Sequence, residues 1–320
     1  MGKGAFGSVI RCLDHKSGKR VAIKLIRDKQ KYHDQTRLER DILKNLQTCS
    51  RIARFLKSFT FRGFFCIVTE LLYKDSYSVL RNQHYCGFHI NQIRMISKQL
   101  AEALFCCHKN QIIHRDIKPE NILFTNKRKI AVKLVDFGCS CYFNKTHFTY
   151  IQSRYFRAPE VVLGLPYGPE IDVWSYACVL VELYTGRPLF PAPSERDLLE
   201  MMVKYIGFPP KEFITGAKRA DKYFDSEGKM KPVQQTSYSK KNNNNKVIPF
   251  SLNFENLLNC NMGPNQDPNN EICLLCDMIK KCLRWCPDQR LTMEEILSHP
   301  FMTMNDSNQN NSVLPPLTHR

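Results

Sequence analysis

One eight-residue segment constrains the fold of this chain more than any other, His114-Arg115-Asp116-Ile117-Lys118-Pro119-Glu120-Asn121. It places a carboxylate at Asp116, an amine at Lys118 and an amide at Asn121 within one short stretch that contains a proline. A carboxylate can accept the proton of a hydroxyl group, and an amide oxygen is a suitable ligand for Mg²⁺. The segment therefore predicts a loop that carries both a general base and a metal ligand.

A second acidic motif, Asp136-Phe137-Gly138, follows twenty positions after Asp116. The alternation of Val132 and Leu134 before it predicts a short strand, which would direct Asp136 toward a metal ion while Phe137 packs behind it. Either acidic residue alone is compatible with an ordinary turn carboxylate. Both motifs in this order and spacing favour a metal-dependent phosphate site.

A glycine-rich segment, Gly2-Lys3-Gly4-Ala5-Phe6-Gly7-Ser8-Val9, opens the chain. Such a turn can lie close over phosphate groups, and it is equally compatible with a plain hairpin. It is followed by Val21-Ala22-Ile23-Lys24, in which a strand lysine can hold phosphates as a point charge. Because the turn begins at the second residue, we expect a shortened first strand.

The first part of the chain predicts a sheet with one helix. Strand patterns cover Ser8–Leu13, Arg20–Ile26 and Phe64–Glu70. Leu38, Ile42 and Leu46 recur every four residues and predict an amphipathic helix that carries Glu39 near the edge of its apolar face. Glu39 would pair with Lys24, or else lie on an exposed face beside Arg40 or Lys44.

After Tyr73 the periodicity becomes helical, for example at Ile93, Ile96, Leu100 and Leu104. We therefore predict an α+β, bilobal fold, with a small β-rich lobe over 1–72 and a larger helical lobe over 73–302. A hinge at 71–75 would join the lobes, and a ligand would bind between them. Polar segments predict an Asn-rich loop near 239–246 and a disordered tail over 303–320.

Net charge and hydrophobicity bear on possible partners. The 47 Lys and Arg against 30 Asp and Glu give a formal charge of +17. No Arg/Lys-rich run with interleaved aromatic residues appears, so we interpret the excess as a solvated basic surface and do not expect a nucleic-acid partner. The longest apolar stretch, Ile171–Leu183, is far shorter than the ~20 residues of a membrane span and predicts a buried helix.

The 14 cysteines are scattered through apolar segments, and no secretory signal opens the chain. We therefore expect reduced cysteines and an intracellular protein, cytoplasmic or nuclear. Cys273, Cys276, Cys282 and Cys286 have spacings compatible with zinc binding, but their apolar surroundings favour a core helix.

Ala158-Pro159-Glu160 and the later Arg290 predict a buried ion pair with a structural role.

At these motifs the chain resembles the eukaryotic protein kinases from Gly2 to Phe301. The resemblance implies ATP and Mg²⁺ between the lobes and transfer of the γ-phosphoryl group to protein substrates, with Lys118 typical of serine/threonine kinases. It implies catalytic roles for Asp116, Lys118 and Asn121, metal binding by Asn121 and Asp136, and structural roles for Glu160, Asp172 and Arg290. The implied nucleotide contacts are Met1, Gly2, Lys3, Gly4, Ala5, Phe6, Gly7, Ser8, Val9, Ala22, Lys24, Glu39, Thr69, Glu70, Leu72, Asp75 and Leu123.

The segment 150–160 (YIQSRYFRAPE) is similar to the CMGC group, and most similar to the dual-specificity tyrosine-phosphorylation-regulated kinases (DYRK). Members of that family phosphorylate the matching tyrosine on themselves, which implies autophosphorylation at Tyr150. Arg154 and Arg157 would bind the new phosphate and repel each other before it is added, and Ser153 would align Asp116. The alternative is that Tyr150 is only a packed aromatic residue.

Several residues depart from the DYRK pattern, namely Arg115 in place of cysteine, the exchanged pair Tyr155-Phe156, Phe148 in place of tyrosine and Cys286 in place of aspartate. Thr69, at the position that gates the adenine pocket by resemblance, replaces the family's more frequent phenylalanine. The departures bear on self-activation more than on catalysis. The competing hypothesis is a kinase-like scaffold or pseudokinase that binds partners through its basic surface.

Overall fold

The computed structural model describes most of the chain, including the two acidic motifs at 114–121 and 136–138. The predicted nucleotide contacts Met1, Ala5 and Phe6 lie outside the described residues, as do Phe148, the loop near 239–246 and the chain beyond Met304. The described ranges are 2–4, 7–27, 30–146, 150–232 and 270–304.

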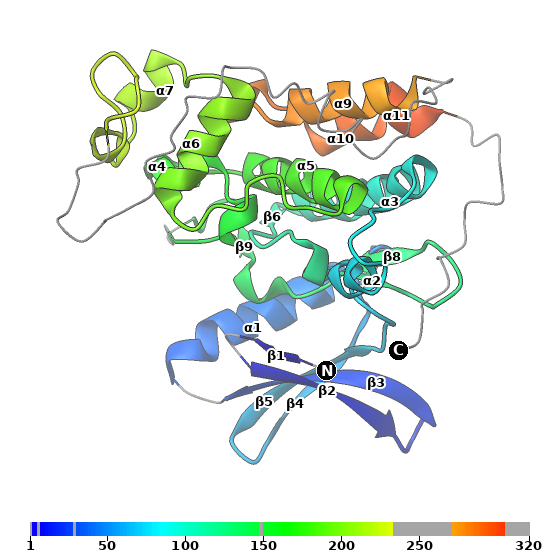
Figure 1. Cartoon of the computed structure of the whole chain (residues 1–320). Helices are drawn as coiled ribbons and strands as arrows, with labels where there is room; N and C mark the ends of the chain where they lie inside the picture. Colours follow the sequence, from blue (N-terminus) through cyan, green and yellow to red (C-terminus); the bar gives the residue numbers. More distant parts are fainter. Residues whose placement is uncertain (1, 5–6, 28–29, 147–149, 233–269, 305–320) are drawn as a thin grey trace.

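A five-stranded antiparallel sheet with one helix forms the small lobe (Figure 1). The strand order is β1-β2-β3-β5-β4, and the helix α1 follows β3 along the chain. Each strand predicted from the sequence is confirmed, while β4 had not been foreseen. The elements are β1 (Gly2–Gly4), β2 (Gly7–Asp14), β3 (Lys19–Arg27), α1 (Gln30–Asn45), β4 (Phe55–Phe61) and β5 (Phe64–Glu70).

Helix α1 forms because its apolar residues recur at helical spacing and find a core. Ile42 and Leu43 on α1, and Leu46 just after it, are each at most 5% exposed. They pack into the same hydrophobic cluster as Ile26 of β3 and Ile67 of β5. This packing fixes the helix beside the sheet and turns the face that carries Glu39 toward β3.

The larger lobe is mainly helical (Figure 1). Its helices are α2 (Ser76–Asn82), α3 (Ile90–Lys109), α4 (Pro159–Leu163), α5 (Glu170–Thr185), α6 (Glu195–Ile206), α7 (Lys211–Thr215), α9 (Glu271–Cys282), α10 (Met293–Leu297) and α11 (Pro300–Thr303). The first residue predicted as tail, Thr303, therefore belongs to a helix.

Short strands and 3-10 turns lie in the connections between the helices. Two antiparallel pairs, β6–β9 and β7–β8, flank the acidic motifs. The strands are β6 (Ile112–Ile113), β7 (Ile122–Phe124), β8 (Val132–Leu134) and β9 (Cys141–Tyr142), and the 3-10 turns are η1 (Pro119–Asn121), η2 (Phe137–Cys139), η3 (Arg154–Phe156), η4 (Ala220–Lys222) and η5 (Pro287–Gln289).

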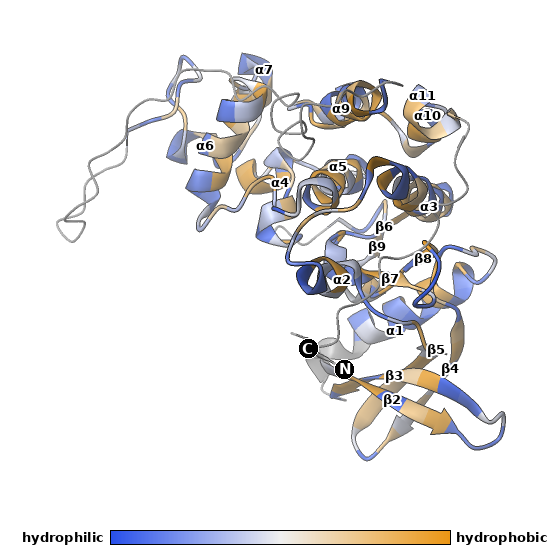
Figure 2. Ribbon diagram, turned by 45° about the vertical axis from the view of Figure 1, so that its right-hand side comes forward, coloured by the Kyte–Doolittle hydropathy of each residue, from blue (hydrophilic) through white to orange (hydrophobic). Residues whose placement is uncertain are grey.

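The core of this lobe is built around α5. Every residue from Ile171 to Tyr184 is buried, as expected for a helix that is apolar on all sides. Figure 2 shows hydrophobic residues running through α5 and the neighbouring helices. In the part of the chain that the structure describes, no helix combines the length and the hydrophobicity that crossing a membrane requires.

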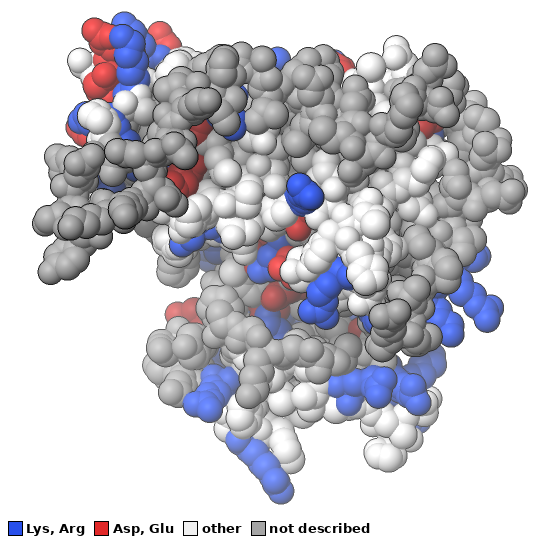
Figure 3. All heavy atoms as spheres, in the orientation of Figure 1, with Lys and Arg blue, Asp and Glu red and all other residues white. Residues whose placement is uncertain are grey.

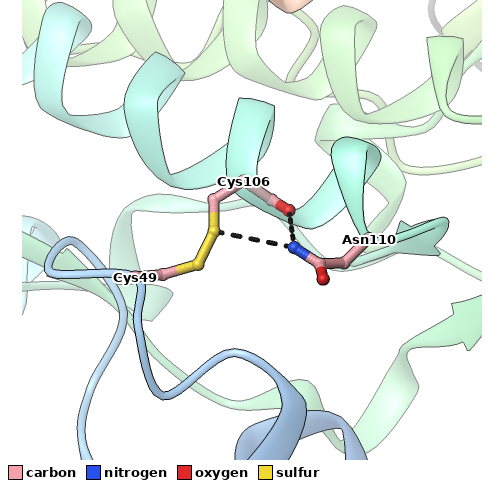
Figure 4. Close-up of a disulfide and its surroundings, with 3 residues drawn as sticks. All are labelled: Cys49, Cys106 and Asn110. Carbon is pink, nitrogen blue, oxygen red and sulfur yellow. Dashed lines mark hydrogen bonds between the residues drawn. A yellow bond between two sulfur atoms is a disulfide. The ribbon is translucent and has the colours of Figure 1, made fainter.

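The cysteines differ in part from the expectation. Helix α9 buries Cys276 and Cys282 as predicted, whereas Cys273 is exposed. Cys49, in the loop after α1, and Cys106, on α3, form a disulfide whose Cα atoms are 6.4 Å apart (Figure 4). The expectation of reduced cysteines is wrong for this pair, because 57 positions separate the two residues and only the docking of the loop on α3 brings them together.

Candidate active site

Three charged side chains from distant parts of the chain meet between the sheet and the helical lobe. Lys24 Nζ lies 2.7 Å from Glu39 Oε1, 2.9 Å from Glu39 Oε2 and 2.7 Å from Asp136 Oδ1. The predicted pair of Lys24 and Glu39 is thus confirmed over its alternative, and Arg40 pairs with Asp41 instead.

Local structure explains how the three charges converge. Lys24 lies on β3 opposite Val9 and Ile67, and Glu39 projects from α1. Asp136 precedes η2 in a left-handed conformation with φ of 61°, and its carboxylate accepts a hydrogen bond from the Gly138 amide. A Cβ atom at residue 138 would lie only 2.8 Å from Lys24 Nζ, so the backbone at Gly138 passes close to the Lys24 amine.

The shared charges shift the protonation equilibria. Burial alone would lower the pKa of Lys24, but the charges of Glu39 and Asp136 outweigh it and raise the pKa. Burial likewise opposes ionisation of Asp136, yet Lys24 holds the pKa of that carboxyl below its usual value. Burial raises the pKa of Glu39 despite the opposing charge of Lys24. The Asp136 side chain remains 45% exposed and open to a ligand.

A second cluster surrounds Asp116. Its Oδ2 accepts a hydrogen bond from Lys118 Nζ at 2.6 Å, and its Oδ1 accepts one from Ser153 Oγ at 2.8 Å. Asn121 Nδ2 donates to the backbone oxygen of Asp116 at 2.8 Å. Asp116 is therefore held by its own loop and by the segment that contains Ser153, the contact that the family resemblance implies.

Asp172 supports this loop from beneath. Its carboxylate accepts the backbone N–H groups of His114 at 2.8 Å and Arg115 at 2.9 Å, and His108 Nε2 lies 3.2 Å away. Burial alone would raise the pKa of Asp172, but its contact with His108 and the His114 amide lower it. The buried carboxylate of Asp172 on α5 thereby fixes the backbone of the two residues that precede Asp116.

Arg115 has a role that the sequence had not revealed. It is 2% exposed, with Nε donating to the Cys139 carbonyl and Nη2 to the Ser140 carbonyl at 3.4 Å. Nη1 donates to the Tyr167 hydroxyl at 3.0 Å. Arg115, one of the residues that depart from the DYRK pattern, thus connects the loop of Asp116 to the segment that follows Asp136.

The segment around Tyr150 is organised by Arg157. The tyrosine is 68% exposed, and its ring lies 4.2 Å from the Arg157 guanidinium. Arg157 donates to Glu195 at 2.8 Å and to the backbone oxygens of Ile151 and Gln152. Glu195 thus offsets the charge of Arg157, while the repulsion between Arg154 and Arg157 stays a prediction.

The protonation of Tyr150 reflects the same neighbours. A hydrogen bond from Arg157 and its positive charge lower the pKa of the Tyr150 hydroxyl, and Arg154 contributes further. Arg154 Nη1 itself donates to the backbone oxygen of Pro193.

The predicted structural pair of Glu160 and Arg290 is present. Two hydrogen bonds of 2.7 Å each join the guanidinium to the carboxylate, and both side chains are fully buried. Arg290 also donates to the backbone oxygens of Glu170, Arg284 and Trp285, so its donors are satisfied without water.

Some of the predicted nucleotide contacts lie on the same side of the sheet as Lys24. Thr69 of β5 is the register partner of Ala22 of β3, so both face the same side of the sheet as Lys24. The backbone at Gly7 passes close to β3. A Cβ atom added at Gly7 would lie only 2.1 Å from the Leu25 carbonyl oxygen. Leu123 is half-buried in β7.

Two of the predicted contacts have other partners. Glu70 accepts hydrogen bonds from the Arg54 amide and from Lys133 Nζ. Both carboxylate oxygens of Asp75 accept from Ser78, so Asp75 caps α2, a helix start that sequence reasoning had missed. Leu72, between them, is buried at 7% exposure.

Comparison with known proteins agrees with this geometry. Residues 1–302 match the protein kinase domain family. Serine/threonine-protein kinase ppk5 of Schizosaccharomyces pombe is 41% identical over 307 residues, which are 94% of this chain and 35% of that protein. Dual specificity tyrosine-phosphorylation-regulated kinase 2 of Drosophila melanogaster is 37% identical over 317 residues, covering 98% of this chain and 42% of that protein.

Dual specificity tyrosine-phosphorylation-regulated kinase 4 of Homo sapiens is 37% identical over 307 residues, covering 94% of this chain and 56% of that protein. The chain thus spans between about a third and just over half the length of these relatives. The match over residues 1–302 extends from the glycine-rich hairpin to α11. The chain therefore belongs to the protein kinase domain family, and within it is similar to the DYRK-family kinases.

Proposed function

We propose that the protein transfers the γ-phosphoryl group of ATP to serine and threonine hydroxyls of protein substrates. The observation that carries this proposal is the pair of adjoining clusters, one of Lys24, Glu39 and Asp136 and one of Asp116, Lys118 and Ser153. The first supplies charges suited to a nucleotide and its metal, and the second a base with a cation beside it. Residues 1–72 and 73–302 would form the two lobes.

The residues present fit Mg²⁺. Asp136 offers an exposed carboxylate, and Asn121 uses its amide nitrogen on Asp116, which leaves the amide oxygen as its metal-binding end. Both are hard oxygen donors of the kind that Mg²⁺ prefers. Bound Mg²⁺ would neutralise charge on the β and γ phosphates. In the view of Figure 3, a group of acidic side chains lies in the middle of the molecule, between the sheet and the helices.

The chain's own groups would perform the chemistry by position and charge. Asp116 would accept the proton of the substrate hydroxyl, and Lys118 would neutralise the moving phosphoryl group. Ser153 would keep the Asp116 carboxylate turned toward the hydroxyl. Lys24, oriented by Glu39, would hold the α and β phosphates, and the backbone of Gly2, Gly4 and Gly7 would cover them.

Thr69, Ala22, Leu72 and Leu123 would contact the adenine, with Glu70 and Asp75 nearby. The support for this assignment is the common face of Ala22, Thr69 and Lys24 on the sheet. The same side of the sheet would then hold the base and the phosphates of one nucleotide.

We also propose that the protein phosphorylates its own Tyr150. The exposed hydroxyl beside Arg157, and Arg154 nearby, supports this, because a phosphate there would gain charge-assisted hydrogen bonds. Protein made in bacteria would be analysed by mass spectrometry. Phosphate at Tyr150 in the active protein and none in Asp136→Ala is the expected result, whereas an active, unmodified protein whose Tyr150→Phe variant keeps full activity would contradict it.

The test of the main proposal is transfer of ³²P from ATP to a generic protein substrate. We expect transfer by the unaltered protein and almost none by Asp136→Ala. A kinase-like scaffold that binds partners through its basic surface predicts the same low signal from both proteins. Figure 3 shows that Lys and Arg side chains are spread around the sheet, as in a solvated basic surface.

A further inference from the structure

The side chain of Gln35 joins α1 to the segment that follows Asp136. Its Nε2 donates to the backbone oxygen of Gly138 at 2.8 Å and to that of Ser140 at 3.2 Å. A primary amide carries two N–H bonds, so both are used. Gln35 precedes Glu39 by four residues on α1, and the two side chains therefore project from the same face of the helix.

Resting on the proposed function, we infer that Gln35 is a positioning residue for phosphoryl transfer. It holds α1 against residues 138–140 and thereby keeps Glu39 in contact with Lys24. The residue touches neither of the two proposed substrates, so its effect passes through Glu39 and Lys24.

The three carbonyl groups of residues 138–140 are bound from two sides. Gln35, in the small lobe, donates to the carbonyl oxygens of Gly138 and Ser140. Arg115, in the loop that carries Asp116, donates to the carbonyl oxygens of Cys139 and Ser140. The segment therefore links α1 to the loop of the proposed base, and Gln35 supplies the small-lobe half of that link.

The position of Gly138 explains why this link controls the charged cluster. A Cβ built on Gly138 would lie 2.8 Å from Lys24 Nζ, 3.1 Å from Asp136 Oδ1 and 3.3 Å from Glu39 Oε2. The Gly138 backbone therefore lies beside all three charged groups. The hydrogen bond from Gln35 to the Gly138 carbonyl therefore fixes the point around which Lys24, Glu39 and Asp136 are arranged.

The chemistry of the amide gives a clean contrast. Glutamate has the shape of glutamine, but its carboxylate has no N–H group and repels the two carbonyl oxygens. Alanine removes the hydrogen bonds without adding repulsion. If Gln35 acts through hydrogen bonds, Gln35→Glu is more harmful than Gln35→Ala; if it only fills space, the order is reversed.

The experiment compares Gln35→Ala and Gln35→Glu with Gln47→Ala and Gln47→Glu, since Gln47 is exposed just beyond α1. We expect kcat to fall about tenfold in Gln35→Ala and further in Gln35→Glu, with KM for ATP changing less than about twofold. Hydrogen exchange of the peptide covering 138–142 is expected to accelerate in both variants. Both Gln47 variants are expected to match the unaltered protein.

Two results overturn the inference. One is a Gln35→Glu variant that equals or exceeds Gln35→Ala in kcat, and the other is unchanged exchange over 138–142 in both variants. If the unaltered protein transfers no phosphate while exchange still accelerates in both Gln35 variants, the link between α1 and residues 138–140 stands and the proposed function alone is wrong.

Discussion

Lys118 Nζ lies 2.6 Å from Asp116 Oδ2, so the proposed base and the proposed phosphoryl-binding cation share a hydrogen bond. Burial alone would lower the pKa of Lys118, but the charge of Asp116 outweighs it and raises the pKa. The lysine therefore stays protonated, and the carboxylate keeps Oδ1 in contact with Ser153. In the proposed mechanism, this arrangement would let proton acceptance and charge neutralisation occur side by side.

Replacing the base tests this arrangement. We predict that Asp116→Asn lowers kcat by at least about a hundredfold, because an amide cannot accept the hydroxyl proton. Steady-state kinetics would measure it, with circular dichroism to confirm folding. Asp288→Asn, an identical change at an exposed position, is the control and is expected to be neutral. Near-normal turnover in Asp116→Asn would rule out its role as base.

Thr69 gives a prediction for inhibitor binding. It shares a side of the sheet with Ala22 and Lys24, and a threonine leaves room that a phenylalanine would fill. Inhibitors with a bulky aromatic extension are expected to bind the unaltered protein more tightly than Thr69→Phe, by about tenfold or more. Calorimetry with one extended compound and its unextended parent would measure this, and equal affinities of both proteins for the extended compound would refute it.

Glu182 predicts a dependence of stability on pH. Burial raises its pKa to about 8, and the charge of Glu120 adds to the effect. Its side chain is 3% exposed, and its Oε2 has no hydrogen-bond partner among the described residues. Because the folded protein keeps this proton while the unfolded chain releases it near its usual pKa, stability falls as pH rises from about 4.5 to about 8.

The variant Glu182→Gln has no ionisable group at this position, so it is expected to lack the part of the pH dependence of stability that Glu182 causes. Its free energy of unfolding, from urea titrations at several pH values, would decrease less than that of the unaltered protein over this range. Glu294→Gln, at an exposed site, is the control and keeps the original slope. Identical slopes in all three proteins would show that Glu182 ionises normally.

The buried pair of Glu160 and Arg290 gives a stability prediction. Arg290→Met leaves a carboxylate unpaired in the interior, and we expect a loss of about 3–5 kcal/mol in the free energy of unfolding. The double variant Glu160→Gln, Arg290→Met is expected to lose less than the sum of the single changes. Arg284→Met at an exposed site serves as control, and additive losses would argue against direct coupling.

The sequence predicted those parts of the site that depend on local spacing. The pairing of Lys24 with Glu39 followed from a strand and a helical face, and the grouping of Asp116, Lys118 and Asn121 followed from one continuous motif, whereas the contact with Ser153 was implied only by the family resemblance. Arg115 and Gln35 were missed as contacts of residues 138–140, because their partners are backbone carbonyls, which no residue type reveals.

Other differences arise from tertiary context. Asp75 was predicted beside the nucleotide, and its carboxylate also begins α2, since Ser78 follows at capping distance. Arg154 and Arg157 were expected to repel each other, and Glu195 of α6, 38 positions after Arg157, was not foreseen as a partner that lies 2.8 Å from Arg157. Such partners appear only once the helices are packed.

The disulfide between Cys49 and Cys106 closes a covalent ring. That ring contains β4, β5, the connection at 71–75, α2 and most of α3, so the two lobes are covalently joined at two separate points. Two covalent connections define a line, and rotation about that line would be the relative motion of the lobes that the oxidised protein restricts least. Reduction would remove one of these connections. The thiol state of these two residues, which lie outside the active site, would thus bear on how the lobes move against each other.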